Sequence, residues 1–409
     1  MPSFSIALTG LAANGIALDT IGNNLANLNT TAYKDQTTTF ANLFYQNLGT
    51  TGSGDAIQVG LGTQVSGTST DFSQGSLTTT TSSTDMALNG NGFFVLEQGG
   101  LEQLTRAGNF QLDQSGNLIT TTGDSVMGYA AANGVVNTNT PLAALQVPVD
   151  ETQSAQATQN FSITGNLDAA TAVGGTFSST ITMYDSLGQS HAATVNFTNT
   201  AANTWSYSIT LPAADASGTP VNNTGTMTFS SSGGLLTPVA NVAGISFPGM
   251  TDGANTLTFN WDLYNASGTP QIGQTVGTST VTGSTQDGFA SGSYQSFSVN
   301  ASGVISAAFS NGQTQNIGQI AVASVTNVEG LTITGGNAYQ TTAASGAASV
   351  GAAGAGGRGS IEDDSLEASN VDISTEFANL IVAQRAFEAN SKTVTTFDTV
   401  TQETINMIH

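Results

Sequence analysis

The chain has 409 residues, of which 27 are acidic, five are Lys or Arg and none is Cys, so its formal net charge is −22. The missing cysteine excludes disulfides, thiolate metal sites and cysteine nucleophiles. Five basic residues cannot neutralise a phosphate backbone or form a polybasic patch, so we expect no nucleic-acid partner. The length favours two to three domains, and 38% hydrophobic residues argue against wholesale disorder.

Membrane and export signals are also missing from the sequence. It contains no run of about 18 apolar residues, so we expect no membrane insertion. The first basic residue is Lys34, which leaves no positively charged start for a cleaved signal peptide. We expect either a cytoplasmic protein or one that leaves the cell by a route that does not read such a signal.

The first predicted element is a helix over residues 4–28. Its apolar residues follow the seven-residue spacing of a coiled coil, and they are Leu11, Leu18 and Leu25, with Ile21 and Leu28 three residues later. Asp19 is the one charged residue among residues 1–33, and Asn and Gly, including Asn24, fill the polar side. Such a neutral face indicates a helix that neighbours can pack on several sides.

The middle of the chain has the signals of β-structure. Alternating apolar residues bounded by Gly, Asn and Asp predict strands within 86–96, 108–119, 161–210, 254–264, 296–309 and 317–333. Two stretches rich in Gly, Ala, Ser and Thr, 47–56 and 343–360, are predicted loops or linkers.

The last predicted element is a second amphipathic helix, with Asp372 as its N-cap. Its apolar row is Ile373, Leu380, Phe387 and Val394, flanked by Phe377 and Phe397. These patterns predict a mixed fold class, with long amphipathic α-helices of coiled-coil spacing at both ends and β-structure between them. The alternative is a two-helix hairpin packed on its own globular domain.

Residues that could support catalysis or ligand binding are few. Gly354–Gly359 matches GxGxxG but follows an Ala/Gly tract, so we interpret it as a flexible linker. His191 and His409 have no second histidine or carboxylate at ligand spacing. Arg106 is predicted to pair with Asp113 or Glu102. We therefore predict no catalytic, cofactor-binding or metal site, no cofactor and no enzymatic activity.

Several motifs occur in a fixed order at the two ends of the chain. They are residues 17–34 (ALDTIGNNLANLNTTAYK), 60–62 (GLG), 71–75 (DFSQG), 92–94 (GFF), 105–108 (TRAG), 366–372 (LEASNVD) and 383–390 (AQRAFEAN). Together they resemble the bacterial flagellar rod and hook proteins. Within this family, the central insertion and the motifs at 165–168, 184–188, 286–289, 311–312 and 318–320 resemble the hook members.

This resemblance implies a structural subunit that self-assembles into a flexible hollow tube, couples rod to filament and transmits torque. The tube would be extracellular, in the hook of the flagellar basal body, and the chain would be exported by the flagellar type III apparatus without a cleaved signal peptide. Its partners would be itself, the distal rod, the hook cap, the hook–filament junction proteins, the hook-length ruler and the export apparatus. The expected assembly residues are Leu11, Leu18, Ile21, Asn24, Leu25, Leu28, Phe377, Leu380, Phe387, Val394 and Phe397.

The resemblance and the periodicity together predict a mixed fold, in which long N- and C-terminal α-helices pair as a coiled-coil-like core and two largely antiparallel β domains, barrel- or sandwich-like, are inserted between them. They divide the chain into four parts. They are a helical core domain (1–30 plus 370–409), linker or extended segments (31–70 plus 343–369), an inner β domain (71–144 plus 285–342) and an outer inserted β domain (145–284). The alternatives are a distal rod protein, which the central insertion disfavours, and a secreted β-rich adhesin, which leaves the matched terminal helices unexplained. A secreted carbohydrate-active enzyme lacks a visible acid/base pair.

Overall fold

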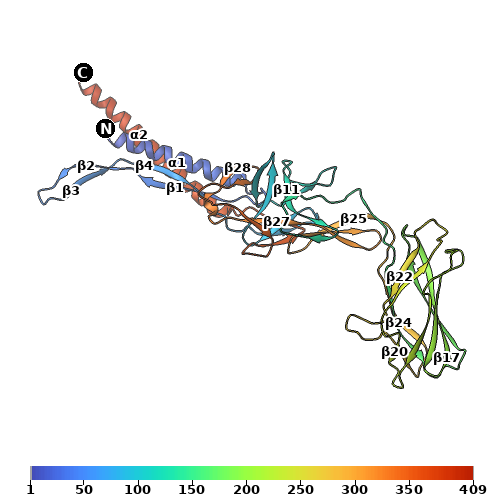
Figure 1. Ribbon diagram of the computed structural model, residues 1–409. Coiled ribbons are helices and arrows are strands. Elements are labelled where there is room, and N and C mark those ends of the chain that lie inside the picture. The colour runs from blue at the N-terminus through green and yellow to red at the C-terminus, as the bar shows by residue number, and fades with distance from the viewer. Residues whose placement is uncertain (1, 409) are drawn as a thin grey trace. The chain divides into compact units, whose positions relative to one another are not determined.

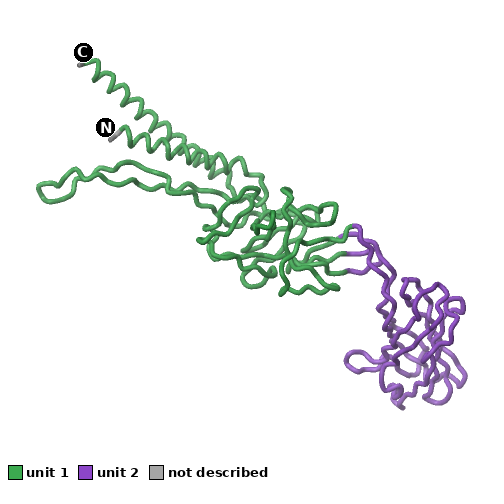
Figure 2. The backbone as a smooth tube through the Cα atoms, turned by 45° about the horizontal axis from the view of Figure 1, so that its top comes forward, with its two compact units in different colours: residues 1–149, 297–307, 315–409 green, residues 150–296, 308–314 purple. Residues whose placement is uncertain are grey.

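The computed structural model describes residues 2–408, and the chain divides into two compact units (Figure 2). Unit 1 comprises residues 1–149, 297–307 and 315–409, and unit 2 comprises residues 150–296 and 308–314. The chain leaves unit 1, builds unit 2 and returns, so both ends of the sequence belong to unit 1.

Two long helices, α1 (Pro2–Ala26) and α2 (Ile373–Ile408), lie side by side in unit 1 (Figure 1). The N-cap prediction for α2 is confirmed, because Asp372 Oδ1 accepts hydrogen bonds from Ser374 N at 2.7 Å and Thr375 N at 3.1 Å. The predicted end of α1 at Leu28 is wrong. The Asn27 side chain donates to the Asn23 carbonyl, and the chain turns after Ala26, since asparagine competes with the helix for backbone groups.

Two narrow hairpins follow α1 within unit 1. Strand β1 (Gln36–Asn42) pairs with β4 (Thr63–Thr70), and β2 (Tyr45–Thr50) pairs with β3 (Ala56–Gly60). The β1–β4 pair packs on α1, with a hydrogen bond of 2.9 Å between Thr38 Oγ1 and Thr20 Oγ1. The prediction of a loop at 47–56 is therefore wrong for its first residues, because strand pairing uses backbone groups that any residue supplies.

The β body of unit 1 is a large sheet with strand order β26-β27-β11-β7-β8-β29-β28. In that order the strands are Val304–Phe309, Thr314–Ser324, Ser125–Ala132, Phe93–Gln98, Leu101–Thr105, Ala338–Gln340 and Thr332–Gly335. Short strands extend it: β9 (Gln111–Leu112), β10 (Leu118–Ile119), β12 (Val135–Val136), β13 (Ala143–Ala144) and β30 (Ser349–Ala352). Strand β30 lies inside the stretch 343–360 that we predicted as a loop or linker, so this prediction is wrong there.

Two further strand pairs of unit 1 join residues from distant parts of the chain. Strand β5 (Leu77–Thr79) pairs with β32 (Ser365–Glu367), and β6 (Met86–Asn89) pairs with β31 (Ser360–Asp363). A single 3₁₀ turn, η1 (Val328–Gly330), follows β27 among the described residues. The apolar run Phe93–Leu96 is buried throughout, which is the pattern of a strand covered on both faces.

Unit 2 contains two five-stranded sheets around one apolar core. The first has the order β16 (Thr176–Tyr184), β17 (Ser190–Ala201), β18 (Thr204–Thr210), β19 (Thr224–Phe229) and β20 (Leu235–Thr237). The second contains β21 (Val242–Phe247), β22 (Leu257–Trp261), β15 (Asn160–Asp168), β23 (Ile272–Thr275) and β24 (Thr280–Gln286). Strand β15 runs parallel to β22 and β23, whereas the first sheet is antiparallel.

The core of unit 2 follows from strict alternation along its strands. In β17 the residues from His191 to Asn199 alternate between buried and less buried positions, as expected for a strand with one face on a core. Trp205 and Trp261, the two tryptophans of the chain, are both fully buried there. A short strand pair, β14 (Thr152–Gln153) with the start of β25 (Gly292–Val299), completes the unit.

Candidate functional site

The terminal helices approach each other through small residues. The buried row of α1 is spaced by three or four residues and consists of Ala7, Gly10, Ala13, Ala17, Thr20 and Asn24. A Cβ atom at Gly10 would lie 3.0 Å from the side chain of Asn390 on α2. Asn24 contacts Glu376 near the other end of the pair, so the helices run antiparallel. Small side chains set a short interaxial distance.

Of the residues that the sequence analysis assigned to assembly, Asn24 belongs to this buried row and the other ten are more exposed. Asn24 is fully buried and Phe377 is 51% exposed. The other nine are partly buried: Leu11, Leu18, Ile21, Leu25, Leu28, Leu380, Phe387, Val394 and Phe397. Sequence reasoning missed the small residues between them, although the spacing of Ala13, Ala17 and Thr20 is itself helical.

Both helices also carry large apolar side chains that the single chain leaves exposed. On α1 they are Phe4, Leu8 and Ile16, and on α2 they are Ile373, Phe377, Ile381, Val382, Val400, Ile405 and Met407. Residues 4–26 of α1 are long and apolar enough, by composition, to cross a membrane. The sequence analysis did not anticipate this, because polar residues and Gly interrupt every apolar run of the helix. A core helix of a soluble protein passes the same test, so the feature is weak evidence of a membrane span.

Asn24 joins three segments at the base of the helix pair. Its Nδ2 donates to Gln36 O at 2.8 Å and to Glu376 Oε2 at 3.2 Å, while its Oδ1 accepts from the Tyr33 hydroxyl and from Gln36 N, each at 3.1 Å. A buried amide is stable only when its donors and acceptors are used, as they are here. This residue therefore ties α1 to α2 and to the start of β1.

A second polar centre lies where the terminal segments enter the β body of unit 1. The buried Glu367 carboxylate accepts hydrogen bonds from Lys34 Nζ at 2.6 Å, Arg106 Nε at 3.0 Å and Gly75 N at 2.9 Å, and Arg106 Nη2 lies 2.9 Å from its Oε2. Burial lowers the pKa of Lys34, and the Glu367 carboxylate opposes this shift. The predicted pairing of Arg106 with Asp113 or Glu102 is wrong, because the fold brings Glu367 to it from 261 positions away.

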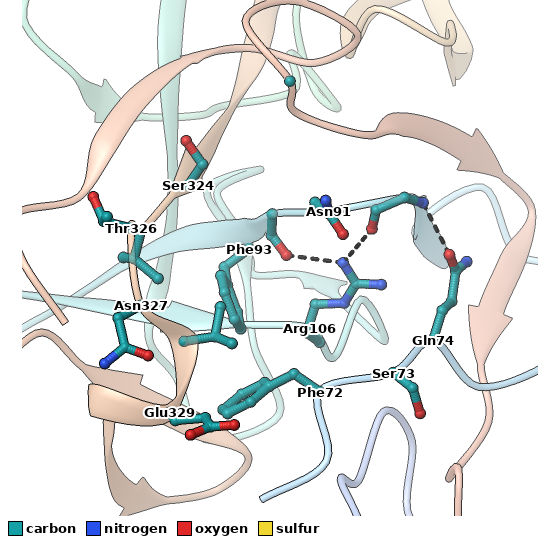
Figure 3. Close-up of a pocket in the computed structure, with 15 residues that line it drawn as sticks. Phe72, Ser73, Gln74, Asn91, Phe93, Arg106, Ser324, Thr326, Asn327 and Glu329 are labelled. Carbon is teal, nitrogen blue, oxygen red and sulfur yellow. Dashed lines mark hydrogen bonds between the residues drawn. The ribbon is translucent and has the colours of Figure 1, made fainter.

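The remaining donors of Arg106 are used by the main chain. Nη1 donates to the carbonyls of Gly90 at 2.7 Å and Gly92 at 2.9 Å, beside a pocket of about 590 Å³ (Figure 3). Figure 3 shows that polar side chains such as Ser324 and Asn327 line the opposite wall. Among the described lining residues Glu329 supplies the one carboxylate, and no nucleophile with an adjacent base accompanies it.

Two other sequence candidates have defined places in the fold. The loop Gly354–Gly359 closes on itself through a hydrogen bond of 2.9 Å from Gly354 N to Gly359 O, and Arg358 Nε donates to Ala352 O at the end of β30. His191 is buried at the start of β17, and the fold brings it carboxylate neighbours that the spacing in the sequence did not indicate. Burial alone would lower the pKa of His191, but hydrogen bonds to Asp185 and Asp215 outweigh it and raise that pKa.

Family models match four successive segments of the chain. They are Flagella basal body rod protein (4–34), Flagellar hook protein FlgE/F/G D1 domain (87–169), Flagellar basal body protein FlaE D2 domain (164–289) and Flagellar basal body rod FlgEFG protein C-terminal (363–407).

Full-length relatives extend this match to almost the whole chain. The flagellar hook protein FlgE of Salmonella typhimurium strain LT2 is 33% identical, covering 99% of this chain and 100% of the relative. That of Escherichia coli strain K12 is 32% identical with the same coverage. The crystal structure of Helicobacter pylori flagellar hook protein FlgE2 shares the fold, with a TM-score of 0.55 at 17% identity over 71% of this chain and 100% of that one.

This protein has two terminal helices and an inserted β unit, and the four family models match it in succession along the chain. These features define an axial protein of the bacterial flagellum. The chain belongs to the flagellar hook protein FlgE family. It is a structural protein of the flagellar hook, into which hook protein polymerises, and not an enzyme.

Proposed function

We propose that this chain assembles into a flexible hollow tube that couples rod to filament and transmits torque. In this tube α1 and α2 form a coiled-coil-like inner core. The observation that carries the proposal is the row of large apolar side chains left exposed on both helices, including Phe4, Leu8, Ile381 and Val382. Burying apolar surface stabilises by about 25 cal/mol per Å², so contacts with further copies are favourable.

The assembly residues proposed from the sequence fit this role. Leu18 and Phe387 are only partly buried in the single chain, so they retain apolar area for a neighbouring copy. The small residues between them, such as Ala13 and Ala17, keep α1 close to α2 and leave these larger side chains on the flanks. In this proposal the small residues hold α1 against α2 within one chain, and the larger apolar residues join the helix pairs of neighbouring chains.

We further propose the four-part organisation of the sequence analysis, with 1–30 plus 370–409 as tube core, 31–70 plus 343–369 as linking segments, 71–144 plus 285–342 as an inner and 145–284 as an outer β domain. Two sheets around one core support a sandwich-like outer domain. Its Ser- and Thr-rich exposed faces favour neutral contacts that exchange at low cost when the tube bends.

Export without a cleaved signal, through the flagellar type III apparatus, is part of the same proposal. So are contacts with the distal rod, hook cap, hook–filament junction proteins and hook-length ruler. They are inferred from membership of the hook protein family.

Electron microscopy of the concentrated or salted-out chain tests the assembly proposal. We expect short tubes from the wild type and none from Leu18→Asp or Phe387→Asp, because each variant puts a charge where neighbouring helices must meet. The exposed neighbours Asp19→Asn and Glu388→Gln are matched controls and should form tubes. Tryptophan fluorescence should show unit 2 folded in all four variants, and normal tubes from Leu18→Asp would refute the proposed role of α1.

A further inference from the structure

A buried histidine of unit 2 lies among three carboxylates from three separate loops. His191, at the start of β17, is 4% exposed. Its Nε2 is 2.9 Å from Asp185 Oδ2 and 3.8 Å from Asp252 Oδ2, and its Nδ1 is 3.0 Å from Asp215 Oδ2. These aspartates follow β16, β18 and β21, so one cluster joins three connections of the unit.

The charges of this cluster do not balance within unit 2. The unit contains no Lys or Arg, and its acidic residues are Asp150, Glu151, Asp168, Asp185, Asp215, Asp252, Asp262 and Asp287. Even a protonated His191 supplies one positive charge against three carboxylates. The cluster therefore keeps negative charge that His191 does not offset, and this charge attracts a cation from solvent. The side chains of Asp215 and Asp252 are 26% and 28% exposed, which gives such a cation a route in.

The geometry suits a metal ion. Asp185, His191 and Asp252 each offer one ligand atom, and these three atoms lie within 4.8 Å of one another. With metal–ligand bonds of about 2.1 Å, separations of 2.9 and 3.8 Å correspond to ligand–metal–ligand angles of about 90° and about 130°. These angles lie within the range of four- to six-coordinate sites.

The surrounding contacts orient both buried ligands. Asp185 Oδ1 accepts from Leu187 N at 2.8 Å and Gln189 N at 2.9 Å in the turn before β17, which leaves Oδ2 for the cluster. Gly188 gives that turn its positive φ of 84°. Asp215 binds Nδ1 of His191, and a carboxylate on the far nitrogen is the usual support of a metal-bound imidazole.

We propose that Asp185, His191 and Asp252 form a site for a divalent transition-metal cation of the Zn²⁺ or Mn²⁺ type, with water completing its coordination. An imidazole ligand disfavours Ca²⁺ and Mg²⁺, which take oxygen ligands. The bound ion would hold the loops after β16 and β21 to the start of β17. This proposal is independent of the assembly proposed above.

Titration calorimetry of the metal-free, full-length chain with ZnCl₂ tests the site. We expect saturable binding of one Zn²⁺ per chain, weakened at least about tenfold in Asp252→Asn. Asp150→Asn makes the same change at an exposed position of the same unit and should bind like the wild type. His191→Gln should also lose the site, and Asp252→Asn keeps the test valid if His191→Gln fails to fold.

A second readout uses the two tryptophans, which report on unit 2 alone. Zn²⁺ should raise the melting midpoint seen by tryptophan fluorescence in the wild type and in Asp150→Asn, but not in Asp252→Asn. Absence of saturable binding by the wild type would overturn the proposal. So would unchanged affinity in Asp252→Asn, or binding that is lost only when the chain's other histidine, His409, is replaced.

Discussion

Two of the five basic side chains of this protein bind one buried carboxylate, that of Glu367. Lys34 follows α1, Arg106 follows β8 and Glu367 precedes α2, so one acid connects three segments of unit 1. In a chain so poor in cations, two of them are used to fix where the terminal segments join the β body.

Replacing Glu367 by Gln should be severe. It leaves Lys34 and Arg106 buried without their counter-charge, which costs about 3–5 kcal/mol of folding free energy. Denaturant unfolding followed by circular dichroism measures this loss. Glu329→Gln, an exposed change in the same unit, should cost less than about 0.5 kcal/mol. Equal stabilities of the two variants would contradict the role of Glu367.

A second prediction about a single residue concerns Asp35, beside Asn24. Burial, together with the nearby carboxylate of Glu376, raises the pKa of Asp35, and its Oδ1 is buried without a hydrogen-bond partner. The native state therefore holds this proton more tightly than the unfolded chain does. The ionised carboxylate costs stability at neutral pH, and this cost disappears as the pH falls through the raised pKa toward and below the ordinary value of 3.8.

Asp35→Asn should therefore gain stability relative to the wild type at pH 7, and the gain should shrink as the pH approaches 4. Unfolding curves of both proteins at several pH values give this difference, and comparing them removes the contribution of other titrating groups. Asp19→Asn, an exposed change on α1, should show no such trend. A difference independent of pH would refute the assignment.

At the scale of elements, the helix pair depends on small residues. The leucines that give α1 its seven-residue spacing flank the contact, and Ala13 and Ala17 fill it. Ala13→Leu should overpack the pair and cost about 1–3 kcal/mol. Ala12→Leu makes the same substitution at an exposed position of the same helix and should be nearly neutral. Helical melting at 222 nm compares them, and equal midpoints would show that the contact lies elsewhere.

At the scale of the molecule, the net charge of −22 opposes association of identical chains. Added salt screens this repulsion, since the Debye length falls from about 30 Å at 0.01 M to about 10 Å at 0.1 M. We expect the protein concentration needed for tubes to fall as NaCl rises over this range, measured by sedimentation and electron microscopy. A neutral osmolyte at matched osmolality is the control. If the protein concentration needed for tubes rises with salt instead, attraction between charges drives assembly.

The sequence by itself determined the two terminal helices, the β character of the middle and the family. Helical periodicity, strand alternation and short motifs are local patterns. Each can be recognised without knowing which residues are in contact in the folded chain. The N-cap at Asp372 and the alternation of buried residues in β17 are two such local features.

Only the tertiary structure decided which side chains become partners. Arg106 and Glu367 are 261 positions apart, and the three aspartates around His191 come from separate loops. The same holds for α1, where periodicity marks a row of leucines but the burial of Ala13 depends on how closely α2 approaches. Contacts between distant residues depend on the path of the whole chain, so the charge centres and the proposed metal site emerge only when that path is known.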